Sequence, residues 1–198
     1  MNMKKVTLVL FAVLMALSVN ALADWTEYPI KAINGSICFP SDCYVFYEGM
    51  PESDVAQKVF GKTTKEVVKY LNSQGALLYV LFDDFETEAT VTYSEINPPI
   101  NFNDCSLVEL KGVGQAISDQ YKSMGADIIN CTPYESNGNK FAQITLKVSV
   151  GSEVNYRSVN MSSKGKKLAQ IIFTSVNNSI TKKEQELFKQ ICGTINFK

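Results

Sequence analysis

The chain has 198 residues, 19 Lys and Arg against 20 Asp and Glu, a formal net charge of −1 and no histidine. A mildly acidic chain without a basic stripe has no evident means of neutralising phosphates, which argues against nucleic acid as a partner. The missing histidine removes the usual general base near neutral pH, every Ser-His-Asp or Cys-His arrangement and the commonest zinc ligand, so carboxylate, Ser-Lys and thiol chemistry remain open.

Residues 1–23 have the pattern of a secretory signal peptide. Lys4 and Lys5 precede an uninterrupted apolar run, and a small-x-small triplet, Ala-Leu-Ala, ends at Ala23. The run is about 14 residues long, shorter than the roughly 20 that a membrane span needs, so cleavage after Ala23 is favoured over an uncleaved anchor. Removing these 23 residues from 198 leaves 175 (24–198), which we expect to be a single exported domain with no transmembrane segment.

The first half of the mature chain is expected to contain two helices followed by a hairpin. Apolar residues keep helical spacing over 53–60, and a Thr63-x-x-Glu66 capping box opens a second helical stretch. The run 76–82 is apolar at every position, which is typical of a strand buried on both faces. Residues 89–93 resume strand composition, so the two runs predict a hairpin.

A loop and a long helix follow. Residues 95–104 are expected to form a loop, because two consecutive prolines cannot enter a sheet interior. Ser106-x-x-Glu109 is a second capping box. Helical spacing then continues for about five turns. The apolar residues that keep it are Leu107, Leu110, Val113, Ile117, Tyr121 and Met124. A strand is expected over 126–131.

The last part of the chain predicts a three-stranded meander and a helix. The strands are 141–150, 154–161 and 167–176, and Thr181-x-x-Glu184 is the capping box of the helix. Two of the predicted strands are apolar on both faces, so both faces of the sheet need cover, which the amphipathic helices can supply. The expected fold class is α+β: an α/β/α sandwich with a mostly antiparallel sheet and helices on both faces.

Five segments resemble the PsbP-like α/β/α sandwich family. They are ICFPSDCY (37–44), the helix-to-strand segment 63–79, YESNGNKF (134–141), the segment 177–188 and INF (195–197). Together they span nearly the whole mature chain. The family includes the extrinsic photosystem proteins of that name, a Ran-binding nuclear import factor and many exported bacterial proteins.

The resemblance implies a protein that binds and supports another protein, since the better understood members act as assembly or regulatory partners. The photosystem and Ran functions are not carried over, because the chain offers no residue motif for either, and fold alone does not imply function. Cys43 departs from the family pattern, in which many relatives have an aromatic residue at the proline turn.

The cysteines are candidates for disulfides, because export leads to an oxidising environment, and five of them leave at least one unpaired. Cys38 and Cys43 flank a turn at a spacing that suits a bridge. A redox pair and half of a metal site are the alternatives, disfavoured because the spacing is not C-x-x-C and no helix starts at the turn. Cys105 and Cys131 form a reasonable second pair. Cys192, on the apolar face of the last helix, is expected to be a buried thiol.

Other features have weaker functional interpretations. The stretch from Asp83 to Glu88 holds four acids and could bind a cation, although acidic turns usually serve solvation. The turn 164–167, with three lysines, is expected to be solvated rather than to bind phosphate or a membrane. Gly112 and Gly114, inside the predicted long helix, favour a close approach of the helix to the sheet. The alternative is that a ligand lies against the helix backbone at these two glycines. The loop over 95–104 is long enough to bind a ligand.

The leading functional prediction is an exported, non-catalytic binding or accessory protein. We expect it to interact with a protein partner in the cell envelope or outside the cell, without catalytic residues, metal or cofactor. Two alternatives come from other classes: a small exported enzyme that uses the thiol pair or carboxylates, and a protein that associates with the membrane surface.

Overall fold

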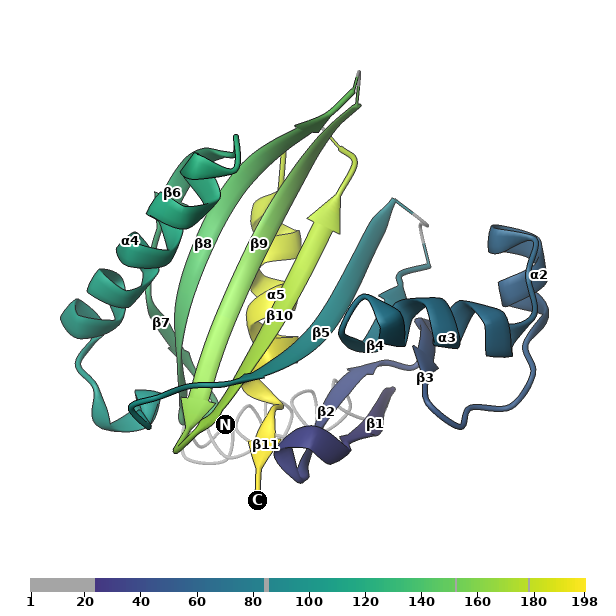
Figure 1. The fold of residues 1–198 in the computed structure, drawn as a ribbon, viewed down its shortest axis with the longest axis horizontal. Coiled ribbons are helices and arrows are strands. Elements are labelled where there is room, and N and C mark those ends of the chain that lie inside the picture. The colour runs from purple at the N-terminus through teal and green to yellow at the C-terminus, as the bar shows by residue number, and fades with distance from the viewer. Residues whose placement is uncertain (1–23, 84–85, 152, 178) are drawn as a thin grey trace, which may run out of the picture.

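The computed structural model describes residues 24–83, 86–151, 153–177 and 179–198 (Figure 1). The predicted signal peptide and part of the acidic stretch, including Asp84, lie outside these residues. In chain order the elements are β1 (Trp25–Ile30), η1 (Lys31–Ile33), β2 (Gly35–Pro40), β3 (Tyr44–Tyr47), α2 (Asp54–Phe60), α3 (Thr64–Ser73), β4 (Ala76–Leu81), β5 (Thr87–Glu95), η2 (Phe102–Asp104), α4 (Leu107–Ser123), β6 (Asp127–Cys131), β7 (Tyr134–Ser136), β8 (Asn139–Val150), β9 (Glu153–Lys164), β10 (Lys167–Ser175), α5 (Lys182–Gly193) and β11 (Asn196–Phe197).

An eight-stranded sheet forms the centre of the fold. Its strands run in the order β3-β4-β5-β10-β9-β8-β6, and β7 also pairs with β8. The hairpin β4–β5 and the meander β8–β9–β10 are those expected from the sequence, and antiparallel pairing of β10 with β5 joins them. Helices cover both faces of this sheet (Figure 1), so the predicted α/β/α sandwich of α+β class is confirmed.

One face of the main sheet carries α4 at one end and α2 with α3 at the other (Figure 1). Leu110 of α4 packs with Ile144 and Leu146, which lie on the same face of β8. Near the opposite edge, Phe46 of β3 packs with Val67 of α3. The two ends of this face therefore have separate apolar cores.

The other face is covered by α5 and by a second, three-stranded sheet. Phe188 of α5 stacks on Phe173 of β10, with ring centroids 4.0 Å apart and an interplanar angle of 8°. The second sheet has the order β1-β2-β11 and buries Ile37 and Phe39 in the same core. The early strand β2 was expected, whereas the pairing of both chain ends with it was not.

The three predicted capping boxes are confirmed. The side chains of Thr63 and Ser106 each accept a hydrogen bond from the backbone N–H of the glutamate three residues later, and Thr181 of α5 does the same. In return Glu66 and Glu109 accept bonds from the capping residues, and these bonds lower the pKa of both carboxyl groups. Short sequence patterns thus set the starts of α3, α4 and α5.

The apolar stripe of α4 is shorter than predicted. Leu107 is 44% exposed and Met124 is 72% exposed, because the two ends of the helix extend past the sheet side chains it covers. Close packing is confirmed for Gly114, where an added Cβ would lie 2.3 Å from the Sγ atom of Cys131. The prediction of close packing is wrong for Gly112, where an added Cβ would have nothing within 4 Å.

Candidate functional site

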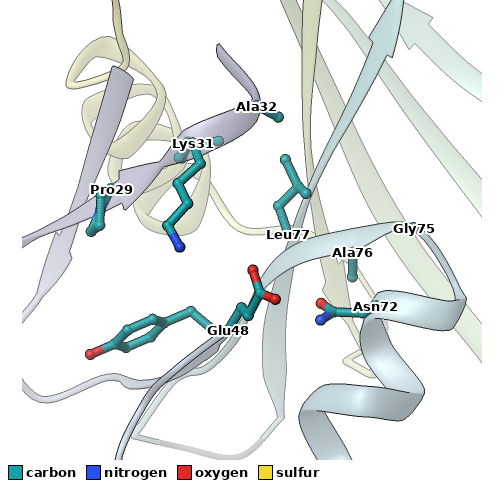
Figure 2. Close-up of a pocket in the computed structure, with 10 residues that line it drawn as sticks. Pro29, Lys31, Ala32, Glu48, Asn72, Gly75, Ala76 and Leu77 are labelled. Carbon is teal, nitrogen blue, oxygen red and sulfur yellow. The ribbon is translucent and has the colours of Figure 1, made fainter. Parts of the chain in front are cut away.

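A pocket of about 250 Å³ lies beside the outer strand β3 of the main sheet. Its walls come from η1, the end of β3, the C-terminal end of α3 and the start of β4 (Figure 2). Pro29, Ala32 and Leu77 supply apolar surface. The pocket thus sits where the two sheets meet.

A β-bulge directs Leu77 to this pocket. In the pairing of β4 with β5, Ala76 is opposite Thr92 and Leu78 is opposite Val91, so Leu77 is the extra residue. Bulges re-aim a side chain and are frequent next to functional sites. Figure 2 shows Leu77 projecting toward the pocket from the start of β4, while Leu78 is buried in the main core.

An aromatic pair supports one wall of the pocket. Tyr47, which lines it, meets the ring of Tyr28 edge to face at a centroid distance of 5.8 Å. Tyr28 in turn contacts Phe39 of the core, with centroids 6.2 Å apart. Burial, together with Tyr47, raises the pKa of Tyr28, so this phenol stays neutral. This wall of the pocket therefore rests on the main core through Tyr28.

Three polar groups reach the pocket from three different elements. Figure 2 shows the amino group of Lys31, the carboxylate of Glu48 and the amide of Asn72 directed toward it. Between the residues that the structure describes, ion pairs join Asp119 to Lys122 and Glu186 to Lys189. Lys31 and Glu48 are exposed and are not among these pairs, so their charged groups face solvent.

A second hollow of about 470 Å³ continues from the first and shares Tyr47, Glu48 and Asn72 with it. Met50 and Val68 give it apolar surface. Besides Glu48, its charged residues are Glu52, Lys65 and Lys69. We call the two hollows together the edge groove.

The edge groove has the composition of a protein-binding surface. Its apolar centre contains Tyr47, Met50 and Leu77, and its rim carries lysines and glutamates. Aromatic residues and methionine are enriched in interface cores, and charged residues surround them. Among the described residues that line it there is no cysteine or serine, and the chain contains no histidine. The arrangement can bind an apolar side chain between charged groups. No sequence pattern predicted these residues as a site, and the one signal for them is the Tyr-Glu-Gly-Met segment that follows a strand.

Cys38 lies on β2, and Cys43 lies just before β3. Cys38 of β2 is half-buried, and its neighbours are Glu27 of β1 and Thr194, which accepts a hydrogen bond from the Cys38 backbone N–H at 2.8 Å. Cys43 is buried in the main core with Phe39. All five cysteines are thiols in the structure. The bridge between Cys38 and Cys43 stays a prediction, which a non-reducing peptide map of the mature protein tests.

The second predicted pair is separated along α4. The Cys105 Sγ atom lies 3.5 Å from the carbonyl oxygen of Asn101, before the helix, and the Cys131 Sγ atom lies 3.6 Å from that of Lys111. Six residues of helix span about 9 Å, so a bridge between these positions would need the start of α4 to move. The same peptide map tests this pair. Cys192 is a buried thiol, as predicted, and burial raises its pKa to about 12.

The charged turns have structural contacts. Lys164 and Lys166 are exposed, as expected of a solvated turn. In addition, Lys164 donates to the carbonyl oxygen of Phe197 at 2.9 Å and Lys167 to that of Ile33 at 3.0 Å. Both lysines thus connect the main sheet to the segments that form the second sheet.

In the acidic stretch, Glu88 accepts a hydrogen bond from the Tyr79 hydroxyl. Over the described part of the chain, no cluster of acids and cysteines is grouped as a metal site would require.

No family model and no curated protein sequence matches the chain. Its structure is similar to that of cyanobacterial PsbP (CyanoP) from Synechocystis sp. PCC 6803, with a TM-score of 0.54, 15% identity and coverage of 89% of this chain and 94% of that chain. It is also similar to a crystal structure from Bacteroides thetaiotaomicron VPI-5482, with a TM-score of 0.52 and 10% identity. The match there covers 88% of this chain but 48% of the other, so this chain spans about half of that protein's length. The PsbP-like fold predicted from the sequence segments is confirmed.

Among the helices in the described ranges, none has the length and apolar character needed to cross a bilayer.

Proposed function

We propose that the mature chain is an exported, non-catalytic accessory protein and that a partner protein docks in the edge groove. The observation that carries this proposal is the apolar pocket in which the bulged Leu77 lies beside the charged side chains of Lys31 and Glu48. A partner would insert an apolar side chain against Leu77 and place polar groups beside the two charges. In protein interfaces, a few residues that fill well-packed pockets carry most of the binding energy.

Three further observations support the proposal. The first 23 residues have the signal-peptide pattern, which favours a site of action outside the cytoplasm. The fold is PsbP-like, and the sequence resembles a family whose better understood members support other proteins. The absence of histidine from the chain leaves the groove without the usual general base.

Site-specific photocrosslinking tests the docking site. Replacing Glu48 with the photoreactive residue p-benzoyl-phenylalanine puts the probe on the groove rim, and the same replacement at Lys122, which is exposed on α4, gives a matched control. In extracts of the cell envelope we expect a defined protein adduct from position 48 and none from position 122.

A second substitution links the adduct to the pocket. Adding Leu77→Asp to the position 48 probe should abolish the adduct, because a carboxylate replaces the apolar anchor, while the Tm shows that the domain still folds. Equal adducts from positions 48 and 122, or an adduct that survives Leu77→Asp, would refute docking in the groove.

A further inference from the structure

A polar hollow of about 440 Å³ lies at the end of the molecule where the C-terminus is found (Figure 1). Four segments that are far apart in the sequence meet there: 101–104, 137–139, 162–164 and 193–197. We call it the terminal hollow. It shares no lining residue with the edge groove. Its volume falls within the range of about 300 to 1,000 Å³ that is usual for small-molecule sites.

Hydrogen bonds between the segments hold the walls of the terminal hollow in place. The side chain of Asn139, at the start of β8, donates to the carbonyl oxygen of Ile195 at 2.9 Å. The ammonium group of Lys164, at the end of β9, donates to the carbonyl oxygen of Phe197 on β11. Because the walls are fixed before a ligand arrives, a ligand is spared the entropic cost of ordering them.

The hydroxyl group of Ser162 is unpaired and opens into the terminal hollow. Ser158, Asn160 and Ser162 share one face of β9, since side chains alternate along a strand. The first two bond to Gln143, at 3.0 and 3.1 Å. Ser162 is only 3% exposed, and its side chain has no hydrogen-bond partner among the described residues.

The Ser162 oxygen is nevertheless accessible. Within the described ranges, the Nε atom of Arg157 is the one side-chain nitrogen or oxygen that is both fully enclosed and unpaired. The Ser162 hydroxyl is unpaired but not fully enclosed, so it is open to the hollow that it lines. Nearly all buried polar groups in proteins have a hydrogen-bond partner, so a group from outside the chain fits here.

Two side-chain amides add to this hydroxyl. Asn137, in the turn between β7 and β8, and Asn196 of β11 line the hollow, and neither side chain bonds to another described residue. Gly193 leaves room for the first of them, because an added Cβ at this position would lie 3.0 Å from the Nδ2 atom of Asn137. A hydroxyl and two amides can each donate and accept, so the hollow offers both kinds of hydrogen bond to a ligand.

The charge of the terminal hollow is balanced. Its charged lining residues are one aspartate, Asp104, and one lysine, Lys164. An ion of either sign would therefore meet a like charge. An apolar ligand would leave the hydroxyl and the amides without partners, which is costly. Ile195 and Phe197 supply a small apolar surface. A sugar has this same combination, with hydroxyl groups around the ring, C–H groups on its face and no net charge.

We propose that the terminal hollow binds a neutral saccharide. Hydroxyl groups of the sugar bond to the side chains of Ser162, Asn137 and Asn196, and one face of a sugar ring lies against Phe197. Binding here does not depend on a partner in the edge groove.

Titration of the mature chain, labelled with ¹⁵N and observed by NMR, tests the proposal. The probes are maltose, cellobiose, lactose and N,N′-diacetylchitobiose, each added up to about 50 mM. We expect at least one disaccharide to shift the side-chain amide signals of Asn137 and Asn196 saturably. Glycerol at the same concentration of hydroxyl groups is the control for non-specific effects and should shift neither signal.

Matched variants connect the shifts to the lining groups. Ser162→Ala removes the hydroxyl, and Asn196→Asp removes an amide donor at an exposed position, so each should weaken binding about fivefold. The same change at Asn130, exposed on β6, is the control and should leave binding unchanged. The Tm shows whether each variant still folds, and Asn196→Asp tests the site even if Ser162→Ala does not fold.

Four results would overturn the proposal. They are no shift with any of the four disaccharides, equal shifts with glycerol, shifts only outside the terminal hollow, and equal affinity of the Asn196→Asp and Asn130→Asp variants. Salt gives a further check, because exposed charges are strongly screened at about 0.5 M NaCl whereas a neutral sugar should bind as before. Loss of binding at that concentration would show that charge drives it, and would also overturn the proposal.

Discussion

Replacing Gly114 by alanine should destabilise the domain, while the same replacement at Gly112 should stabilise it. Alanine is favoured over glycine inside a helix by about 1 kcal/mol. At Gly112 an added Cβ has nothing within 4 Å, so this gain is realised. At Gly114 the Cβ would lie 2.3 Å from the Sγ atom of Cys131 and 3.9 Å from atoms of Gln143 and Ile144.

The clash at Gly114 outweighs the helix propensity of alanine. Overpacking a core typically costs about 1 to 3 kcal/mol. Cys131 is a short side chain whose Sγ atom also lies 3.6 Å from the carbonyl oxygen of Lys111, so it must change rotamer or push α4 away from β8. We expect Gly114→Ala to lower the free energy of unfolding by up to about 2 kcal/mol net, and Gly112→Ala to raise it by about 0.5 to 1 kcal/mol.

Urea unfolding followed by circular dichroism measures both changes. The double variant Gly114→Ala, Cys131→Ala removes the clashing sulfur, so its stability should exceed that expected from adding the two single changes. If Gly114→Ala stabilises the protein as much as Gly112→Ala does, the close approach of α4 to Cys131 is refuted. If the double variant shows no coupling, the clash lies elsewhere.

Three further changes have defined outcomes. Gly35→Ala should displace β11, because the added Cβ would lie 1.7 Å from the backbone oxygen of Asn196, and digestion by carboxypeptidase should become faster than in the unmodified protein. The lowered pKa values of Glu66 and Glu109 contribute stability that is present above the usual value of 4.5 and is lost as the pH falls through the lower folded pKa. In the double variant Glu66→Gln, Glu109→Gln, the Tm should therefore fall less steeply than in the unmodified protein as the pH is lowered. The same dependence of Tm on pH in both proteins would contradict this. In reduced protein, the Cys192 thiol, with its pKa of about 12 and full burial, should resist alkylation at pH 8 until urea unfolds the domain.

Elements set by local patterns could be predicted from the sequence. A capping box such as Thr63-x-x-Glu66 acts within four residues, so its outcome hardly depends on the rest of the chain. Ile144 and Leu146 of β8 are buried against α4. Gln143, on the other side of the strand, is polar and yet buried, which no local pattern indicates. Its side chain donates a hydrogen bond to Asn160, which also accepts one from the Tyr134 hydroxyl at 3.0 Å.

The candidate site depended on features that sequence patterns do not contain. The uniform apolar run 76–82 gave no sign that Leu77 would be the extra residue of a bulge. The second sheet joins segments far apart in the chain, as the bond between the Cys38 backbone and the Thr194 side chain shows, and no local signal specifies such pairing.

The pairing of β2 with β11 has a consequence for the order of events during synthesis. β2 is the second strand of the chain, yet its backbone partners include Asn196 and Phe197, and the Cys38 backbone is hydrogen-bonded to Thr194 across 156 residues. The N-terminal strand cannot complete its contacts until α5 and β11 have left the ribosome, and structures with such distant contacts fold slowly. A chain that stays open until its last helix is made remains available to a translocation machinery that accepts unfolded polypeptides, which suits the export proposed for it.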